Sequence, residues 1–142
     1  MTLVFRVRMP DGVAAKTDGR DIWIDDRLNE VQEKCAIAHE EEHIRRGQGS
    51  VQVEAEEMSV RYKVAMDLLP LDVIVGVCKN GKSLAGIARE LQVTRQVLMD
   101  RAATLTDEQA QAAGCLECRL CPVIAARYSG HPVGRSRYAQ VA

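Results

Sequence analysis

Hydrophobic and polar residues first alternate along the chain and then recur with a helical period. The segment Leu3 to Arg8 ends in near-alternation, which favours a short strand closed by the turn residues 10–12. Residues 21–24 fit a second extended segment, because they are mostly apolar and follow the turn-forming pair Asp18-Gly19. The first part of the chain therefore predicts a small sheet.

Beyond residue 24, apolar residues recur every three to four positions, as they do on one face of a helix. The first helix is expected to begin at a cap, Asp25 or Asp26. It should run to about Arg46 and end at Gly47, with an apolar stripe formed by Leu28, Val31, Cys35 and Ala38. Further helices are predicted over residues 53–69, 71–79, 83–91 and 95–105, with a new helix cap at 106–108. The predicted fold class is α+β, with a helical C-terminal part.

Composition and charge narrow the class of protein. The chain is 46% hydrophobic and 27% charged, which is ordinary for a globular domain, and its net charge of −1 gives little general attraction to nucleic acid. Residues 1–80 carry 15 acidic and 11 basic side chains (net −4), and residues 81–142 carry 5 and 8 (net +3), which indicates different partners for the two parts.

The sequence offers neither a membrane span nor an export signal. No apolar run approaches the roughly 18 to 20 residues of a membrane-spanning helix. Arg6 and Arg8 interrupt the apolar N-terminal stretch, which makes it a poor signal peptide. We therefore expect a cytoplasmic protein with no membrane partner.

Two of the three histidines lie four residues apart, in His39-Glu40-Glu41-Glu42-His43. Because helical residues at this spacing share a face, His39 and His43 can offer nitrogens to one metal ion at about 2.0 to 2.1 Å. Glu40 is displaced by about 100° around the helix, where it can reach a water beside the ion and act as a general base for amide hydrolysis. Glu41 is expected to be solvated, and Glu42 at most to support the ligands. The alternative is a chance arrangement on an exposed acidic helix.

A catalytic zinc ion usually takes three protein ligands and leaves a fourth position open. The next predicted helix offers three carboxylates, Glu54, Glu56 and Glu57. Spacing alone leaves all three open as the third ligand.

The order of these motifs resembles the ImmA/IrrE family of metallo-endopeptidases, especially the short forms of actinobacterial phages and mobile elements. The resemblance covers roughly residues 20–106 and is carried by Ala38 to His43, followed by Glu57, Val60, Val64-Ala65 and Leu68-Leu69-Pro70. In that family the third zinc ligand is a glutamate about thirteen residues before the proline that ends its helix, a position that Glu57 occupies relative to Pro70.

The resemblance implies a small zincin-like, gluzincin-like domain that binds Zn²⁺. It implies His39, His43 and Glu57 as metal ligands and Glu40 as the catalytic base. It also implies a protein substrate, such as a phage or mobile-element repressor with its own helix-turn-helix, in the cytoplasm of a bacterial host cell.

Residues 83–105 match the packing pattern of a helix-turn-helix. Ala88 is small where the two helices would cross, and Val97 and Leu98 supply apolar side chains on the inner face of the second helix. The same pattern also fits a plain helical hairpin that covers the core.

A DNA-binding interpretation would direct Arg95, Gln96 and Arg101 toward a groove or the phosphate backbone. Asp100 on the same helix and the lack of a basic stripe in the sequence favour the hairpin. A DNA- or protein-binding regulator with a structural metal site is therefore the second function hypothesis, beside the zinc peptidase.

The last segment places three thiols at three-residue intervals, Cys115, Cys118 and Cys121. Thiolates at this spacing are good ligands for zinc or an iron–sulfur cluster. A fourth ligand would have to come from His131, Cys35, Cys78 or a second chain. The alternative is a tail of reduced thiols without metal.

The sequence thus predicts three parts. A zincin-like metallopeptidase core covers residues 1–70, a helix-turn-helix-like extension covers 71–113, and an irregular cysteine-containing tail covers 114–142.

Overall fold

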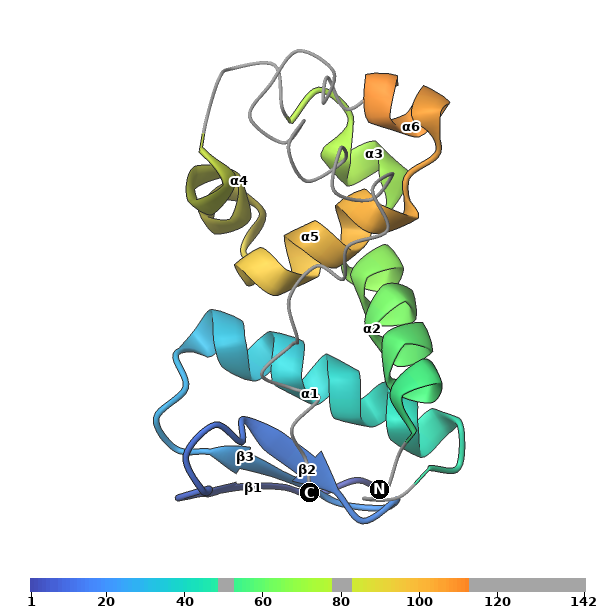
Figure 1. Cartoon of the computed structure of the whole chain (residues 1–142). Coiled ribbons are helices and arrows are strands. Elements are labelled where there is room, and N and C mark those ends of the chain that lie inside the picture. The colour runs from blue at the N-terminus through green and yellow to red at the C-terminus, as the bar shows by residue number, and fades with distance from the viewer. Residues whose placement is uncertain (49–52, 78–82, 113–142) are drawn as a thin grey trace. The chain divides into compact units, whose positions relative to one another are not determined.

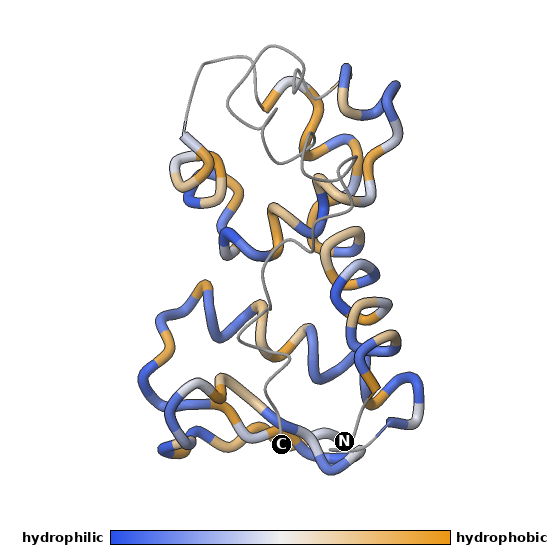
Figure 2. The backbone as a smooth tube through the Cα atoms, viewed as in Figure 1, coloured by the Kyte–Doolittle hydropathy of each residue, from blue (hydrophilic) through white to orange (hydrophobic). Residues whose placement is uncertain are grey.

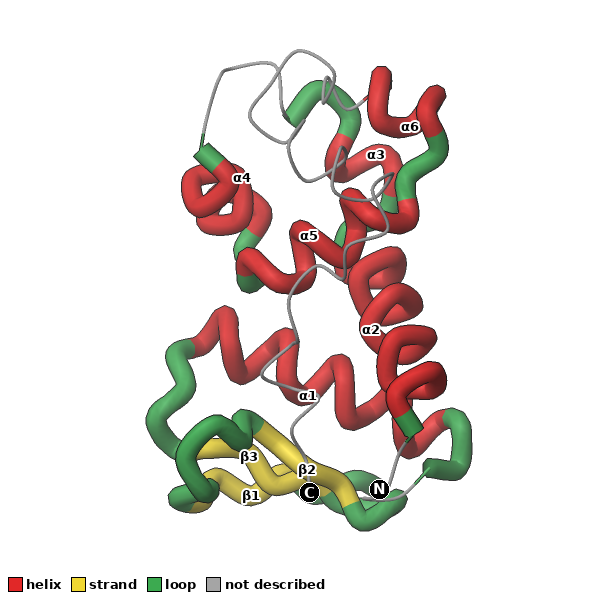
Figure 3. The backbone as a smooth tube through the Cα atoms, in the orientation of Figure 1, coloured by secondary structure: helices red, strands yellow, loops and turns green. Residues whose placement is uncertain are grey.

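A computed structural model describes residues 1–48, 53–77 and 83–112, which form three strands and six helices (Figures 1 and 3). The predicted α+β class is confirmed. The elements are β1 (Val4–Val7), β2 (Ala15–Thr17), β3 (Ile22–Asp25), α1 (Glu30–Arg45), α2 (Glu54–Leu68), α3 (Leu71–Ile74), α4 (Leu84–Leu91), α5 (Arg95–Thr104) and α6 (Asp107–Ala112). The described residues belong to two compact units, one ending at Val64 and the other beginning at Ala65. Among the helices of the described residues, none is long and apolar enough to cross a membrane.

The strands form one sheet in the order β1-β3-β2. β1 runs parallel to β3, with Val4 opposite Ile22, and β2 runs antiparallel to β3, with Ala15 opposite Ile24. Both strands that the sequence predicts are present. The sequence interpretation missed β2, because Ala-Lys-Thr is too short to show an alternating pattern and is extended through its pairing with β3.

Helix α1 covers one face of this sheet (Figure 1). Ile22 and Ile24 are fully buried and form the core with Ala15 and with Ala36 of α1. Burying such an isoleucine side chain contributes about 1.5 to 3 kcal/mol. Because this packing holds α1 on the sheet, it also fixes the direction in which the side chains of α1 point.

The other face of the sheet carries an aromatic cluster. The rings of Phe5 and Trp23 stack with their centroids 5.6 Å apart, and the Lys16 ammonium lies 5.7 Å from the centre of the Trp23 ring. These three residues are cross-strand neighbours in the sheet register. Such pairs add to the stability of the short strands that support α1.

Helix α1 begins later than the sequence predicts. Its cap is Asn29, whose Oδ1 accepts a hydrogen bond from the backbone N–H of Gln32 at 2.9 Å, while Gln32 Oε1 accepts one from the Asn29 N–H at 2.9 Å. The prediction of a cap at Asp25 or Asp26 was wrong. Asp25 ends β3, and its carboxylate instead pairs with the Arg27 guanidinium at 2.9 Å.

The buried face of α1 also differs from the predicted stripe. Cys35 is buried as expected, but Val31 and Ala38 are only half-buried. The fully buried face includes His39 and His43, which therefore lie inside it and not at its border. The C-terminal half of α1 is nevertheless hydrophilic in sequence (Figure 2). Buried polar side chains need polar partners, so apolar core packing alone does not account for the burial of this half of the helix.

The second unit contains the helix pair that the sequence indicates. Ser83 caps α4 through a 3.0 Å bond from Gly86 N–H, and Gln92 ends it in a left-handed conformation with φ +57°. Thr94 then caps α5, accepting from Val97 N–H at 3.2 Å. The residues expected inside the pair, Ala88, Val97 and Leu98, are buried, and so is Ile87.

The helix predicted over residues 71–79 is shorter in the structure. α3 ends at Ile74, because Val75 leaves the helical conformation and Gly76 follows with φ +72°. Helix α6 begins at Asp107, within the predicted cap region 106–108. Its first turn is held by Thr106, whose Oγ1 accepts from Gln109 N–H at 3.2 Å.

A DNA-binding interpretation requires the Arg101 side chain to face solvent, but it does not. Its guanidinium is buried, with Nε donating to the Leu69 carbonyl at 2.7 Å and Nη1 donating to Thr104 Oγ1 at 2.9 Å. The Leu69 carbonyl follows the last turn of α2, where backbone carbonyls lack helical partners. Asp100 is buried too and accepts from Gln96 Nε2 at 2.9 Å. The DNA-facing role for Arg101 was therefore wrong.

We expect an Arg101→Met substitution to lower the free energy of unfolding by about 1.5 to 3 kcal/mol, because it removes the charge-assisted hydrogen bond to the buried Leu69 carbonyl. Urea denaturation followed by circular dichroism measures this change. Arg95→Met, at the exposed start of α5, is the matched control and should stay within about 0.5 kcal/mol of the wild type. Equal effects of the two substitutions would contradict a structural role for Arg101.

Candidate metal centre

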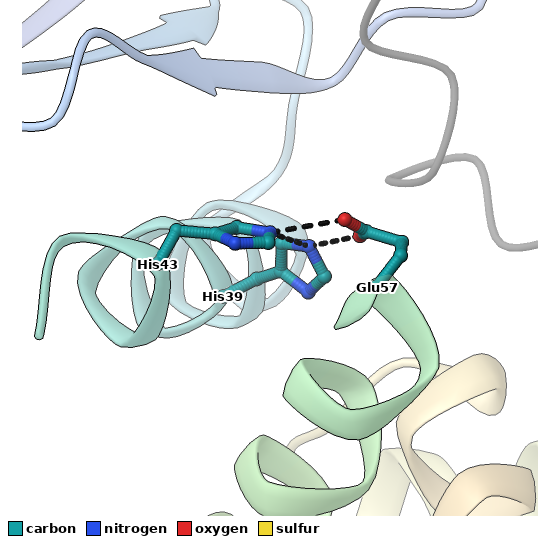
Figure 4. Close-up of side chains that lie close together, drawn as sticks. All are labelled: His39, His43 and Glu57. Carbon is teal, nitrogen blue, oxygen red and sulfur yellow. Dashed lines mark hydrogen bonds and ion pairs between the residues drawn. The ribbon is translucent and has the colours of Figure 1, made fainter. Parts of the chain in front are cut away.

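Two adjacent helices bring together the three residues proposed as metal ligands (Figure 4). His39 and His43 extend from the same face of α1, and Glu57 extends from the first turn of α2. The two histidine Nε2 atoms lie 3.1 Å apart. Glu57 Oε1 is 2.5 Å from His39 Nε2, and Glu57 Oε2 is 3.0 Å from His43 Nε2. All three side chains are buried.

These atoms fit the requirements of a zinc ion. A tetrahedral ion with bonds of about 2.0 to 2.2 Å separates its ligand atoms by about 3.3 to 3.6 Å, a little more than the spacing of the two Nε2 atoms. Glu57 Oε1 is buried and, although it lies close to His39 Nε2, receives no hydrogen bond of good geometry from the residues that the structure describes. A buried carboxylate oxygen without such a bond is costly unless a cation lies beside it.

The charge state of Glu57 suits a metal ligand. Burial acts to raise the pKa of its carboxyl, but the imidazoles of His39 and His43 outweigh burial and lower that pKa to about 2. For His43 the signs are reversed. Burial acts to lower the pKa of its imidazole, but the Glu57 carboxylate and the Gln48 side chain outweigh burial and raise that pKa. The site therefore stabilises a negative oxygen beside groups that can share a positive charge.

Glu40 lies on α1 next to His39 and is also buried. Burial raises the pKa of its carboxyl to about 7, with the positive charge of His43 opposing the rise and the negative charge of Glu57 adding to it. A carboxyl with a pKa near neutrality can both accept and return a proton under ordinary conditions, which is what a general base in amide hydrolysis must do.

The remaining carboxylates considered as ligands lie elsewhere. Glu54 and Glu56, the other two candidates for the third ligand, are exposed in the first turn of α2. Glu41, which the sequence predicts to be solvated, is exposed on α1. The helical phase of α2 therefore selects Glu57 among the three candidates. The second predicted metal site falls outside the described residues, as do its members Cys115, Cys118, Cys121 and His131 and the candidate fourth ligand Cys78.

Sequence reasoning missed a network that joins the two ligand-bearing helices. The buried Glu42 carboxylate accepts from Arg45 Nε at 2.7 Å and from Arg46 Nε at 2.7 Å. Arg46 Nη1 also donates to Ser59 Oγ on α2 at 2.8 Å. The arginines hold the pKa of Glu42 at about 2, against the opposing effect of burial. The signal was present in the sequence, because carboxylate–arginine pairs three and four residues apart meet on a helix.

We expect Arg46→Met to lower the free energy of unfolding by about 1 to 2 kcal/mol, since it leaves a buried carboxylate with one partner fewer and breaks the contact to α2. Arg45→Met is the matched control and should cost less, because the Arg45 side chain is 63% exposed and that of Arg46 is 23% exposed. Urea denaturation of the two variants measures the difference. A larger loss for Arg45→Met would contradict the bridging role of Arg46.

Comparison of the chain with protein-family models, with curated proteins and with solved structures gave no match. The site is therefore the structural feature that bears on function. Its features are two histidines one helical turn apart, a carboxylate from the next helix within 3.0 Å of both, and a buried glutamate beside them.

Proposed function

We propose that this chain is a zinc-dependent endopeptidase in which His39, His43 and Glu57 hold the ion and Glu40 is the general base. The observation that carries the proposal is the convergence of three buried ligand atoms, one of them a carboxylate oxygen without a well-formed hydrogen bond. The resemblance to the ImmA/IrrE metallo-endopeptidases supports the same function.

In the proposed peptide hydrolysis, the ion and the side chains of this chain have different roles. Zinc, when bound by such ligands, is a Lewis acid that polarises a peptide carbonyl and makes water easier to deprotonate. The Glu40 carboxylate takes one proton from the attacking water as its oxygen bonds to the carbonyl carbon. The C–N bond then breaks, and Glu40 delivers the proton to the leaving amine nitrogen. His39, His43 and Glu57 keep their positions throughout.

The proposed substrate is a regulatory protein, such as a phage or mobile-element repressor with a helix-turn-helix, cleaved in the bacterial cytoplasm. This part of the proposal rests on the family resemblance. Cleavage would remove the repressor and change gene expression. Co-production with such a repressor, followed by mass spectrometry of its fragments, identifies the cleaved bond.

The metal site is tested by zinc stoichiometry in the full chain. A variant with serine at positions 115, 118 and 121 removes the thiols of the second predicted metal site. We expect this variant to retain one zinc ion per chain after dialysis, and to lose it when His39→Ala is added. Retention of the ion by the His39→Ala chain would refute the site.

A second candidate function is a non-catalytic DNA- or protein-binding regulator with a structural metal ion. The observation that favours it is the α4–α5 pair, whose capped helices and short turn follow the helix-turn-helix pattern. Binding to duplex DNA that weakens with salt and with Arg95→Ala would support it. Since Arg101 is buried, its substitution no longer tests DNA contact.

A further inference from the structure

The C-terminal end of α1 has a specific turn geometry. Gly47 adopts a left-handed conformation with φ +71°, which a glycine takes without a steric penalty. Its N–H donates to the Ile44 carbonyl at 2.9 Å, and the N–H of Gln48 donates to the His43 carbonyl at 2.9 Å. This pair of bonds is a Schellman motif, which turns the chain back over the last helical turn. The turn brings the Gln48 side chain next to the His43 ring.

Gln48 contacts the ring nitrogen of His43 that points away from Glu57. Gln48 Oε1 lies 2.8 Å from His43 Nδ1. A carbonyl oxygen can only accept a hydrogen bond, so this contact requires a proton on Nδ1. In the neutral ring Nε2 then has a free lone pair. This Nε2 is the ring nitrogen on the side of the other two proposed ligands, 3.0 Å from Glu57 Oε2 and 3.1 Å from His39 Nε2.

We propose that Gln48 is a positioning residue for the metal centre, which fixes the tautomer and orientation of His43 so that Nε2 is presented as a metal ligand. This inference rests on the proposed zinc site. Metal-binding histidines commonly donate their second ring N–H to a carbonyl or carboxylate oxygen, which orients the ring and makes the ligand nitrogen more basic. Here the acceptor comes from the turn that ends the ligand-bearing helix.

The test is the zinc affinity of the full chain with serine at positions 115, 118 and 121, measured by competition with a chromogenic chelator. Gln48→Leu removes the acceptor at similar size and should weaken zinc binding by roughly 10- to 100-fold. Gln48→Glu restores an acceptor oxygen, so we expect it to bind zinc at or above the wild-type affinity. Rescue by glutamate and not by leucine distinguishes the hydrogen bond from packing.

Gln32→Leu is the matched control, because Gln32 also makes a side-chain hydrogen bond on α1 but at its opposite end. It should lower the stability of the chain through the lost cap while leaving zinc affinity unchanged. Long-range ¹H–¹⁵N NMR spectra of the zinc-bound chain give a second readout. They should show the proton of His43 on Nδ1 in the wild type and in Gln48→Glu.

The outcomes separate this inference from the peptidase proposal. Wild-type zinc affinity in Gln48→Leu, or zinc on Nδ1 of His43, overturns the role of Gln48 and leaves the metal centre intact. Failure of the wild-type chain to bind zinc overturns both. If Gln48→Leu does not fold, the zinc affinity of Gln48→Asn is compared with that of the wild type instead. The asparagine side chain is one methylene shorter, so its amide oxygen no longer reaches His43 Nδ1.

Discussion

A Glu40→Gln variant is expected to bind zinc as the wild type does and to lose roughly 10²- to 10⁴-fold of its cleavage rate, because general-base catalysis contributes about that much. The amide has the size of the carboxyl but cannot take up the proton of the attacking water. The three ligands are unchanged, so the metal remains. The measurement is the rate at which a repressor-type helix-turn-helix protein is cut, with zinc content determined on the same sample.

Glu41→Gln is the control for this variant, since it makes the same change of charge at the neighbouring, exposed position. It should leave both the cleavage rate and the zinc content at wild-type values. If Glu40→Gln kept its metal and its full biological effect, proteolysis would be the wrong function. The metal site would then be structural, as the second candidate function requires.

A Glu57→Ala variant is expected to weaken zinc binding by more than the roughly 100-fold that loss of a supporting residue costs, because it removes a direct ligand. It should also abolish the stabilisation of the fold by zinc. A ligand present at 100 times its Kd stabilises a protein by about 2.7 kcal/mol. We expect the wild type, and not Glu57→Ala, to show a gain of this size in urea denaturation with and without zinc.

Glu56→Ala provides the comparison, because Glu56 is the exposed neighbour of Glu57 on the same turn of α2. Its zinc affinity and its zinc-dependent stability should match those of the wild type. Equal zinc affinity in Glu57→Ala and Glu56→Ala would show that the third ligand is another residue. The two histidines would then need a different partner than the one that the geometry indicates.

The histidine pair could be predicted from the sequence because its geometry is local. A spacing of four residues on one helix places His39 and His43 on the same face whatever surrounds them. The choice of Glu57 over Glu54 and Glu56 was different, since it depends on how α2 packs against α1. Spacing left all three open, and only the family resemblance indicated the residue that the structure places beside the histidines.

The parts that could not be predicted are those determined by contacts between distant segments. β2 has no strand pattern of its own, and it is extended because it pairs with β3. Arg101 looks like a surface cation in the sequence but is needed at the Leu69 carbonyl, 32 residues earlier. The Gln48 contact with His43 follows from the left-handed turn at Gly47, which the sequence indicated only as a helix end.

The three proposed ligands lie close together in the sequence, which affects how early in folding the site can form. Glu57 follows His43 by only 14 positions, and a loop of about ten residues closes in roughly 10 to 100 ns. All three proposed ligands, the sheet and α1 belong to the same one of the two compact units. The three side chains can therefore meet soon after α1 and the first turn of α2 form, without waiting for contacts between distant parts of the chain.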